Sequence, residues 1–348
     1  MTGAAHGNAP LPEHIEASVV YLNAPRELEI RQEGLATKSI GAGEILCETL
    51  LTAISPGTEL GAYTGLPALR AGAAYPRLQG YCNVARVLAL GPGVSGIRCD
   101  DRVLSFASHR SHYVMAAADV LLVLSKDAKA DEVVCTYLYH LGYDAVLRAN
   151  VRAGNRVLVV GLGVLGLTSV AMAGVAGARV FAVSNHSIPQ RIALESGASA
   201  VFPRSDLQGL RTALTEGLAD VVIVTSNSWE DWLICLEMAA MRGVIACLGF
   251  PGRGQAPAAL NPLDSRFFYA KQLQIMAVGM SPEKPDARGF LRFNERDNMK
   301  FLAHLIEIER LRPRMLVSGT YAAGDIDRAY CDLLRRKDSA ITYLLRWH

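Results

Sequence analysis

The sequence has no cysteine pair at C-x-x-C spacing. Its seven cysteines are odd in number and scattered along the chain: Cys47, Cys82, Cys99, Cys135, Cys235, Cys247 and Cys331. A disulfide framework needs an even and clustered set of cysteines in a small secreted chain. The sequence therefore predicts reduced thiols and a cytoplasmic protein.

The sequence also lacks an excess of charge and a long apolar run. A formal net charge of +2 gives no basic surplus to bind nucleic acid or an anionic membrane. The longest apolar stretch, from Val170 to Val183, is interrupted by Gly174, Gly177 and Arg179, and spanning a bilayer takes about 20 apolar residues. Residues 1–14 contain no basic segment followed by an apolar one, so we expect a mobile tail without a signal peptide. A small molecule is the expected partner, with no nucleic acid and no membrane.

What remains is an ordinary globular composition. Hydrophobic residues make up 51% of the 348 and charged residues 20%, which argues against disorder. At roughly 150 residues per domain, the length predicts two domains with separate cores.

The first third of the chain reads as β-structure. Short apolar or alternating runs are separated by turn signals such as Gly41-Ala42-Gly43 and Gly91-Pro92-Gly93, which predicts a barrel-like domain. The expected strands are Ala17–Leu22, Glu27–Glu33, Glu44–Ala53, Tyr81–Leu90, Arg102–Phe106 and His112–Ala116.

From about Lys129 the pattern changes to alternating helices and strands. The expected strands are Arg156–Val160, Arg179–Val183, Asp220–Thr225 and Val244–Leu248, and the expected helices are Glu132–Arg148, Val164–Val175, Pro189–Gly197, Leu207–Glu216 and Trp229–Met241. Apolar strands that alternate with helices predict a parallel sheet covered on both faces. The helices Phe293–Glu309 and Gly324–Arg336 and the strand Ala340–Arg346 then close the β domain.

A glycine turn lies between the strand Arg156–Val160 and the helix that follows it. It reads Gly161-Leu162-Gly163-Val164-Leu165-Gly166. The first glycine permits the tight turn, the second lets the backbone approach a pyrophosphate, and the third lets the helix pack on the strand. The N–H groups and the positive dipole end of that helix receive phosphates. The strand, turn and helix together predict a Rossmann dinucleotide-binding domain.

The end of the second strand bears on which nicotinamide cofactor binds. NAD sites place Asp or Glu there to accept the ribose 2′-OH. This chain has Ser184-Asn185-His186-Ser187, with Arg191 one helical turn further on. Ser184, His186 and Arg191 can donate to a 2′-phosphate. The sequence therefore favours NADP, and NAD stays possible.

The order of these segments resembles the medium-chain dehydrogenase/reductase superfamily from about Ala17 to Trp347. Similar stretches include Asp100-Asp101-Arg102-Val103, Glu195-Ser196-Gly197-Ala198 and Asp325-Ile326-Asp327-Arg328-Ala329-Tyr330, and Gly249-Phe250-Pro251-Gly252 resembles the loop that closes over the nicotinamide. The resemblance implies an α/β fold with a GroES-like β-barrel catalytic domain at 15–128, a Rossmann domain at 129–289 and a closing catalytic segment at 290–348. It also implies an active site between the domains and a homodimer.

The chain departs from this family at the zinc ligands. Ser55-Pro56-Gly57-Thr58-Glu59 stands where zinc members carry a cysteine, Gly80-Tyr81-Cys82 where they carry G-H-E, and Tyr137 near the third ligand. Zinc needs about three deprotonated N, S or O ligands. The lobe of four cysteines is also missing, so we expect a zinc-free member, similar in its S-x-G-T-E segment to bacteriochlorophyllide and sugar or cyclitol dehydrogenases.

Without a metal, hydroxyls and imidazoles must stabilise and protonate the oxygen that receives charge during hydride transfer. The candidates are Tyr81, Thr58, Tyr137, His140 and Glu59. Thr58 corresponds to the family's proton-relay hydroxyl, and Tyr81 replaces a histidine ligand. Tyr137 and His140 share a helical face. Alternatives stay open: Tyr81 as a core aromatic, His140 as a helix-surface or packing residue, and Glu59 as a residue that fixes its own turn.

Three functions are compatible with these residues. The first is a zinc-free NAD(P)-dependent oxidoreductase that interconverts an alcohol and a ketone or aldehyde on a small polar or natural-product substrate. The second is an NADPH-dependent C=C reductase of the enoyl or quinone type. The third is a non-catalytic nucleotide-binding protein.

Overall fold

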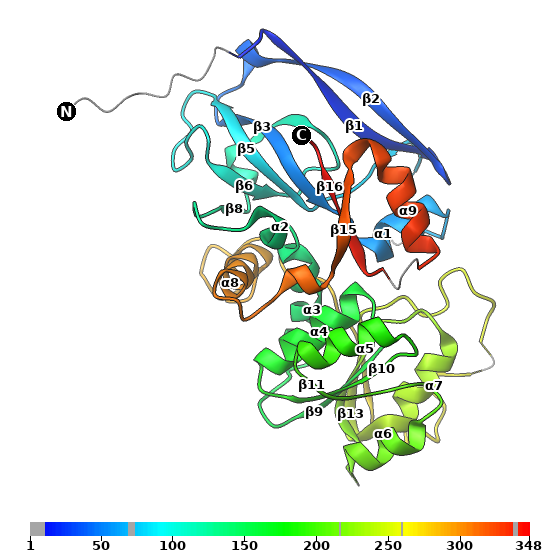
Figure 1. Ribbon diagram of the computed structural model, residues 1–348. Coiled ribbons are helices and arrows are strands. Elements are labelled where there is room, and N and C mark those ends of the chain that lie inside the picture. Colours follow the sequence, from blue (N-terminus) through cyan, green and yellow to red (C-terminus); the bar gives the residue numbers. More distant parts are fainter. Residues whose placement is uncertain (1–10, 69–73, 216, 259, 337–339) are drawn as a thin grey trace.

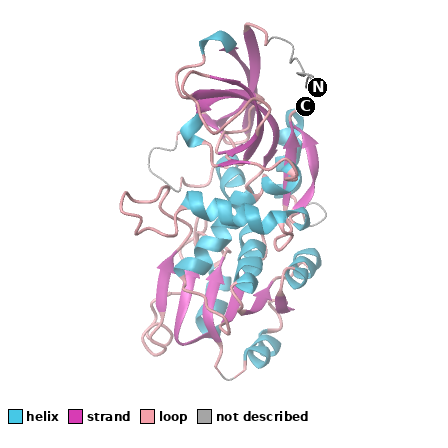
Figure 2. Cartoon of the chain, turned by 90° about the vertical axis from the view of Figure 1, so that its left-hand side faces the viewer, coloured by secondary structure: helices cyan, strands magenta, loops and turns pink. Residues whose placement is uncertain are grey.

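The computed structural model describes residues 11–68, 74–215, 217–258, 260–336 and 340–348 (Figure 1). Figure 1 shows the first strands of the chain in the upper half of the molecule and the second sheet, with its helices, in the lower half. Figure 2 shows a layer of helices between these two parts.

The upper part is built from two β-sheets. One has the strand order β2-β1-β4, and the other has the order β15-β16-β3-β5-β6-β8, with β7 paired to β3. The strands are β1 (His14–Ala24), β2 (Glu27–Ala36), β3 (Glu44–Ala53), β4 (Arg77–Leu78), β5 (Asn83–Leu90), β6 (Arg102–Ser105), β7 (His112–Ala116), β8 (Leu122–Val123), β15 (Val317–Ala322) and β16 (Thr342–Arg346). The last two strands come from the closing segment, so the chain returns to the part where it began.

The lower part is a parallel sheet in the order β11-β10-β9-β12-β13-β14. Its strands are β9 (Arg156–Val160), β10 (Arg179–Val183), β11 (Ala198–Phe202), β12 (Ala219–Val224), β13 (Ala239–Cys247) and β14 (Gln274–Ala277), and its helices are α4 (Val164–Val175), α5 (Ser187–Glu195), α6 (Leu207–Leu214) and α7 (Trp229–Met238). Val157 and Val159 of β9 belong to one buried cluster, and Leu158 and Val160 belong to another. Both faces are therefore covered, as a parallel sheet requires. The predicted fold class, a Rossmann domain with a β catalytic domain, is confirmed.

The remaining helices lie where the two parts meet or close the upper one. They are α1 (Pro56–Tyr63), α2 (Ala130–Val133), α3 (Thr136–Arg148), α8 (Glu295–Glu307) and α9 (Ile326–Leu334). Helix α3 packs against both α4 and α8. We propose the division 15–128, 129–289 and 290–348 on the basis of these sheets.

Several sequence predictions need correction. The helix expected at Glu132–Arg148 is two helices, and the helix expected to reach Met241 ends at Met238. Ala239 instead pairs with Ala219 in the sheet, so tertiary pairing overrides helix propensity there. The sequence pattern did not predict β4, β8, β11, β14, β15 and α1. Helix α1 is short and contains Gly57 and Thr58, which are weak helix formers, but Pro56 occupies its first turn, where the missing N–H costs nothing.

All seven cysteines are free thiols. Within the described ranges, none of the helices has the length and the apolar character that a membrane crossing requires.

Candidate active site

The turn from β9 into α4 has the geometry of a phosphate cradle. Gly161 has a φ of +94°, a conformation that a side chain rarely adopts. A Cβ on Gly166 would lie 1.9 Å from the Gly161 carbonyl oxygen, whereas a Cβ on Gly163 would meet nothing within 4 Å. Gly163 is also the N-cap of α4. Two glycines thus permit the close turn, and the third leaves open space at the helix N-terminus for a phosphate.

The carboxyl ends of three neighbouring strands meet at this turn. Thr225, after β12, donates its hydroxyl to the Gly161 carbonyl at 2.9 Å. Asn227 accepts from the Phe250 N–H at 2.8 Å, which fixes the loop after β13. Because β9 lies between β10 and β12, this edge is the point where the strand order reverses, and dinucleotides bind at such points. Gly249 and Phe250, predicted as cofactor residues, therefore lie at the same sheet edge as the glycine turn.

The predicted 2′-phosphate residues follow β10. Ser184 is 3% exposed, and its hydroxyl accepts the His186 N–H at 3.2 Å. Asn185 accepts the Arg204 N–H at 2.8 Å. His186 and Arg191 are exposed, with Arg191 on α5. Ser184 and His186 are thus brought together, while Arg191 keeps its place one turn further on.

Arg336 also lies at this site, although the sequence did not indicate it as a candidate donor to a 2′-phosphate. It follows α9, and its Nη1 donates to His186 Nε2 at 2.8 Å. The two residues are 150 positions apart, so only the tertiary fold reveals the contact. A guanidinium beside His186 adds a charged donor where a 2′-phosphate would bind.

A loop after β13, in the lower part of the molecule, contacts the upper part. Arg253 donates its Nε to the Pro67 carbonyl at 2.8 Å, and its guanidinium lies against Gly61 of α1. The guanidinium also lies 5.7 Å from the ring centre of Phe250. The loop after β13 therefore contacts α1, the helix that carries Thr58.

Three hydroxyls gather at the position where the family resemblance places zinc ligands. The Tyr81 hydroxyl donates to Ser55 Oγ at 2.5 Å. Burial, followed by the nearby acidic groups of Cys82 and Glu59, raises the pKa of Tyr81 well above its usual range, and hydrogen bonds to Ser55 and Thr58 oppose this rise. The phenol is therefore protonated at physiological pH and acts as a donor. Ser55, considered beforehand only as a lost ligand, is its direct partner.

Aromatic rings extend this cluster toward α3. The ring of Tyr137 contacts Tyr81 edge-on, with centroids 5.5 Å apart, and Phe106 edge-on at 4.9 Å. His140 stacks on Tyr137 at 5.4 Å with an interplanar angle of 17°. The structure thus brings Tyr81, Tyr137 and His140 together, as their positions predicted, and adds Phe106, which is 38% exposed.

His140 is a buried, neutral imidazole. Burial lowers its pKa to about 4, and the carboxylate of Asp144 only partly opposes this effect. Asp144 itself accepts hydrogen bonds from the Gly279 N–H and the Ser281 hydroxyl, both at 2.6 Å. His140 Nε2 lies 3.4 Å from the Asn298 amide, and its Nδ1 has no partner among the described residues. His140 therefore packs Tyr137 in place and is not a surface residue.

Glu59 is occupied by structural hydrogen bonds. It is 2% exposed, and one carboxylate oxygen accepts the Ser55 N–H at 2.6 Å. The other accepts from the Tyr330 hydroxyl at 2.5 Å and contacts His109 Nε2 at 2.9 Å. Glu59 thus holds Ser55 through its backbone and ties α1 to α9.

The side chains at the positions of the expected zinc ligands are a poor fit for zinc. Pro56 has no ligating atom and occupies the first turn of α1. Cys82 is 1% exposed, and burial raises the pKa of its thiol well above its usual range. Protonated Tyr81, a protonated thiol and a serine hydroxyl are poor substitutes for thiolate and imidazole.

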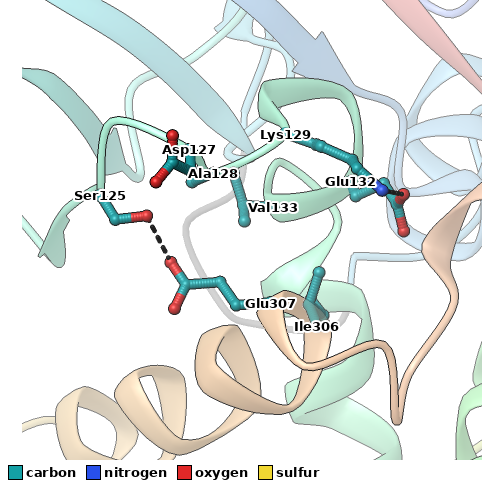
Figure 3. Close-up of a pocket in the computed structure, with 8 residues that line it drawn as sticks. All are labelled: Ser125, Asp127, Ala128, Lys129, Glu132, Val133, Ile306 and Glu307. Carbon is teal, nitrogen blue, oxygen red and sulfur yellow. Dashed lines mark hydrogen bonds and ion pairs between the residues drawn. The ribbon is translucent and has the colours of Figure 1, made fainter.

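A separate pocket lies between α8 and the segment that leads into α2 (Figure 3). Its volume is about 160 Å³, whereas ligand pockets measure roughly 300–1,000 Å³. Ser125 donates to Glu307 at 3.0 Å across it, and Lys129 forms an ion pair with Glu132. It is too small for a dinucleotide and none of the candidate residues line it.

Comparisons with known proteins agree with this geometry. Residues 164–295 match the family model described as zinc-binding dehydrogenase. An NADP-dependent isopropanol dehydrogenase of Entamoeba histolytica is 30% identical over 139 residues, which is 38% of this chain and 38% of that protein. A probable alcohol dehydrogenase of a Pseudomonas species is 30% identical over 191 residues, 51% of this chain and 59% of that protein.

Solved structures share the whole fold. L-idonate 5-dehydrogenase of Escherichia coli is 15% identical with a TM-score of 0.79, covering 96% of this chain and 99% of its own. A putative zinc-binding dehydrogenase of Sinorhizobium meliloti bound to NADP is 16% identical with a TM-score of 0.78, covering 96% and 100%. An alcohol dehydrogenase of Escherichia coli complexed with NADH is 18% identical with a TM-score of 0.76, covering 97% and 100%. Together the matches show that residues 164–295 are similar to the zinc-binding dehydrogenase family and that the chain shares the fold of these dehydrogenases.

Proposed function

We propose that this chain is an NAD(P)-dependent oxidoreductase that interconverts an alcohol and a ketone or aldehyde without a zinc ion. The observation that carries the proposal is the Tyr81–Ser55 hydroxyl pair at the zinc-ligand positions, beside a glycine turn built for a dinucleotide. The substrate class we propose is a small polar or natural-product molecule, since Thr58 and the exposed face of Phe106 offer it both polar and aromatic contacts.

The described residues fit a nicotinamide dinucleotide. The open space at Gly163 and the N-terminus of α4 would hold its pyrophosphate, and Gly249 and Phe250 lie at the same sheet edge. Ser184, His186 and Arg336 support NADP as the preferred form, with NAD as the weaker one. When bound, the nicotinamide supplies or accepts the hydride.

Tyr81 would hold and move the proton. In the reductive direction the substrate oxygen accepts the Tyr81 proton as the carbonyl carbon receives the hydride, which yields the alcohol. Ser55 and Thr58 then stabilise the phenolate by donating to it, and the proton is restored from solvent. Tyr137 and His140 hold the Tyr81 ring through edge and stacking contacts.

The test is a screen that follows the absorbance of the reduced cofactor in both directions, with NADP(H) and NAD(H), against ketones, alcohols, enones and quinones. Turnover of ketones or alcohols supports the proposal. Turnover of enones or quinones alone would instead assign a C=C reductase, since a phenol also protonates an enolate. A chain that binds the cofactor and turns over nothing in the screen would be a nucleotide-binding protein.

Zinc independence has its own measurement. Protein treated with a chelator should keep its turnover, because the residues at the ligand positions are protonated hydroxyls and a buried thiol. Loss of turnover on stripping, restored by one equivalent of zinc, would overturn this part of the proposal.

A cytoplasmic homodimer completes the proposal. The seven free thiols support a reducing compartment. Strand β14 is at the edge of the parallel sheet, and nearby apolar side chains are exposed, at 74% for Tyr269, 68% for Met280 and 78% for Phe290. Exposed apolar side chains beside a free strand edge favour pairing with a second copy. Light scattering should give twice the mass of the chain.

A further inference from the structure

We propose a second, metal-binding site in the β part of the molecule, formed by Glu48, His112 and His348 and suited to Zn²⁺. One ligand atom from each residue lies within 4.8 Å of the other two. Glu48 Oε1 lies 3.9 Å from His112 Nε2 and 3.7 Å from His348 Nε2. These distances are too long for hydrogen bonds.

The β-sheet topology brings the three residues together. Strands β7 and β16 both pair with β3, at Glu44–Glu48 and at Leu51–Ala53 respectively. Glu48 lies directly opposite His112 in the first pairing. The chain leaves β16 along β3 toward Glu48, with the Trp347 N–H bonded to the Leu50 carbonyl, and so delivers His348 to the same point. Figure 1 shows this end of the chain beside β3.

Neighbouring groups orient the ligand atoms. Arg86 donates its Nε and Nη2 to Glu48 Oε2 at 3.0 and 2.6 Å, which leaves Oε1 facing the imidazoles. The Ser111 hydroxyl engages His112 Nδ1 at 3.1 Å, which leaves Nε2 facing Glu48. Metal-ligating histidines commonly use their second nitrogen in this way, which fixes the tautomer and the ring orientation.

The chemistry of the ligand set points to zinc. Two imidazoles and one carboxylate bind Zn²⁺ at about 2.0–2.2 Å and leave a fourth position for water. Tetrahedral ligands at that range are about 3.4 Å apart. The two distances from Glu48 to the imidazoles therefore need to shorten by only tenths of an ångström around an ion. Glu48 and His112 are mostly buried, with side chains 18% and 14% exposed, while His348 is 44% exposed and leaves an entry path. Mg²⁺ prefers an oxygen set and should bind far more weakly.

We expect a bound ion to link the residues after β16 to β3 and β7. The site is separate from the Ser55–Tyr81 cluster, because Ser55 lies beyond the carboxyl end of β3 and Glu48 lies in the middle of that strand. It does not depend on the proposed oxidoreductase function.

The experiment is calorimetric titration of the metal-free full chain with Zn²⁺, with Mg²⁺ as comparison, together with the unfolding midpoint at each metal concentration. The native chain should bind about one equivalent and show a midpoint that rises until the site is saturated. Glu48→Gln, His112→Ala and His348→Ala should each weaken binding by more than the roughly 10- to 100-fold that loss of an outer partner causes. The exposed His304→Ala, on α8, is the matched control and should bind as the native chain does.

Metal-free variants are checked by their unfolding midpoint, and His348→Ala, the most exposed change, tests the site if a buried variant does not fold. Co²⁺ in place of Zn²⁺ gives an absorption spectrum that the three variants should lose and Tyr81→Phe should keep. A native chain that binds no Zn²⁺, or a His348→Ala chain that binds it unchanged, overturns the site. If a His348→Ala chain still holds zinc and loses its turnover when treated with a chelator, that result would instead count against the zinc-free active site.

Discussion

The glycine turn and the hydroxyl cluster lie on opposite sides of the boundary between the two parts, and we expect them to respond differently to substitution. At the turn, the backbone would form the proposed binding surface, and a positive φ at Gly161 and a close contact at Gly166 constrain both positions to glycine. At the cluster, side chains would do the proposed chemistry, and Pro56, Tyr81 and Cys82 stand where the resemblance places metal ligands. Glu59 holds the local turn there by accepting hydrogen bonds from the Ser55 N–H and the Tyr330 hydroxyl.

The comparison separates two kinds of requirement. A dinucleotide needs a fixed backbone shape, which few sequences supply. A developing charge on oxygen needs only a well-placed donor, which a metal ion or a phenol can supply. The predictions below test whether the two regions are as independent as this contrast implies.

The largest effect is expected from Gly166→Ala. Its Cβ would lie 1.9 Å from the Gly161 carbonyl oxygen, so α4 must move away from the turn. Overpacking costs about 1–3 kcal/mol and occasionally more, and a backbone clash should reach the upper end. We expect an unfolding free energy lower by about 3 kcal/mol or more and no measurable cofactor binding by fluorescence titration.

The matched control is Gly174→Ala on the same helix. Its Cβ would meet its nearest neighbour, the Ser196 carbonyl oxygen, at an ordinary 3.7 Å. This variant should bind the cofactor normally and gain slightly in helix propensity. Equal affinity of Gly166→Ala and Gly174→Ala would show that the turn does not shape the site.

Tyr81→Phe should break the other region alone. The change removes the hydroxyl that donates to Ser55 and keeps the ring that packs on Tyr137. Losing an oxyanion-type donor costs roughly a hundredfold in turnover, or about 3 kcal/mol. Cofactor affinity should stay the same, because the glycine turn lies in the other part. Steady-state kinetics of the variant, with Tyr143→Phe on α3 as control, measure this effect. A parent rate in Tyr81→Phe would make Tyr81 a core residue and move attention to Tyr137 and His140.

The same contrast explains how far sequence predicts the molecule. Strands β3, β7, β9 and β10 and helix α4 have the predicted ends, because local periodicity and turn residues define them. Short or edge elements such as β14 carry too few residues for a pattern, and α1 has a composition that favours a turn. Contacts between distant segments, such as Arg336 with His186, have no local signal at all. The proximity of Tyr81 and Tyr137 also has no local signal. It was predicted only because the family resemblance places both residues at the positions of ligands to one zinc ion.

A pH-dependent effect should arise from His140. Its pKa in the folded protein is about 4, below the ordinary value of 6.5, so the unfolded chain binds a proton that the folded chain does not. Its contribution to stability is complete above pH 6.5 and is lost as the pH falls toward 4, by about 2 kcal/mol at pH 5. His140→Phe should keep the stack on Tyr137 and lose this part of the pH dependence. Urea unfolding at pH 5 and pH 7 measures it, and equal pH slopes for the two proteins would contradict it.

The smallest effect concerns the choice between NADP(H) and NAD(H), because both cofactors would use the same glycine turn. Ser184→Asp places a carboxylate where the ribose 2′-OH would bind, so it should accept that hydroxyl and repel a 2′-phosphate. We expect the preference to shift toward NADH by about tenfold, equivalent to about 1.4 kcal/mol. Arg336→Gln should weaken NADPH binding and leave NADH binding unchanged, because its guanidinium lies beside His186. Titrations of both variants with both cofactors separate the two contributions. If the native chain binds NADH as tightly as NADPH, the residues after β10 do not read the 2′-phosphate, and the preference for NADP is wrong.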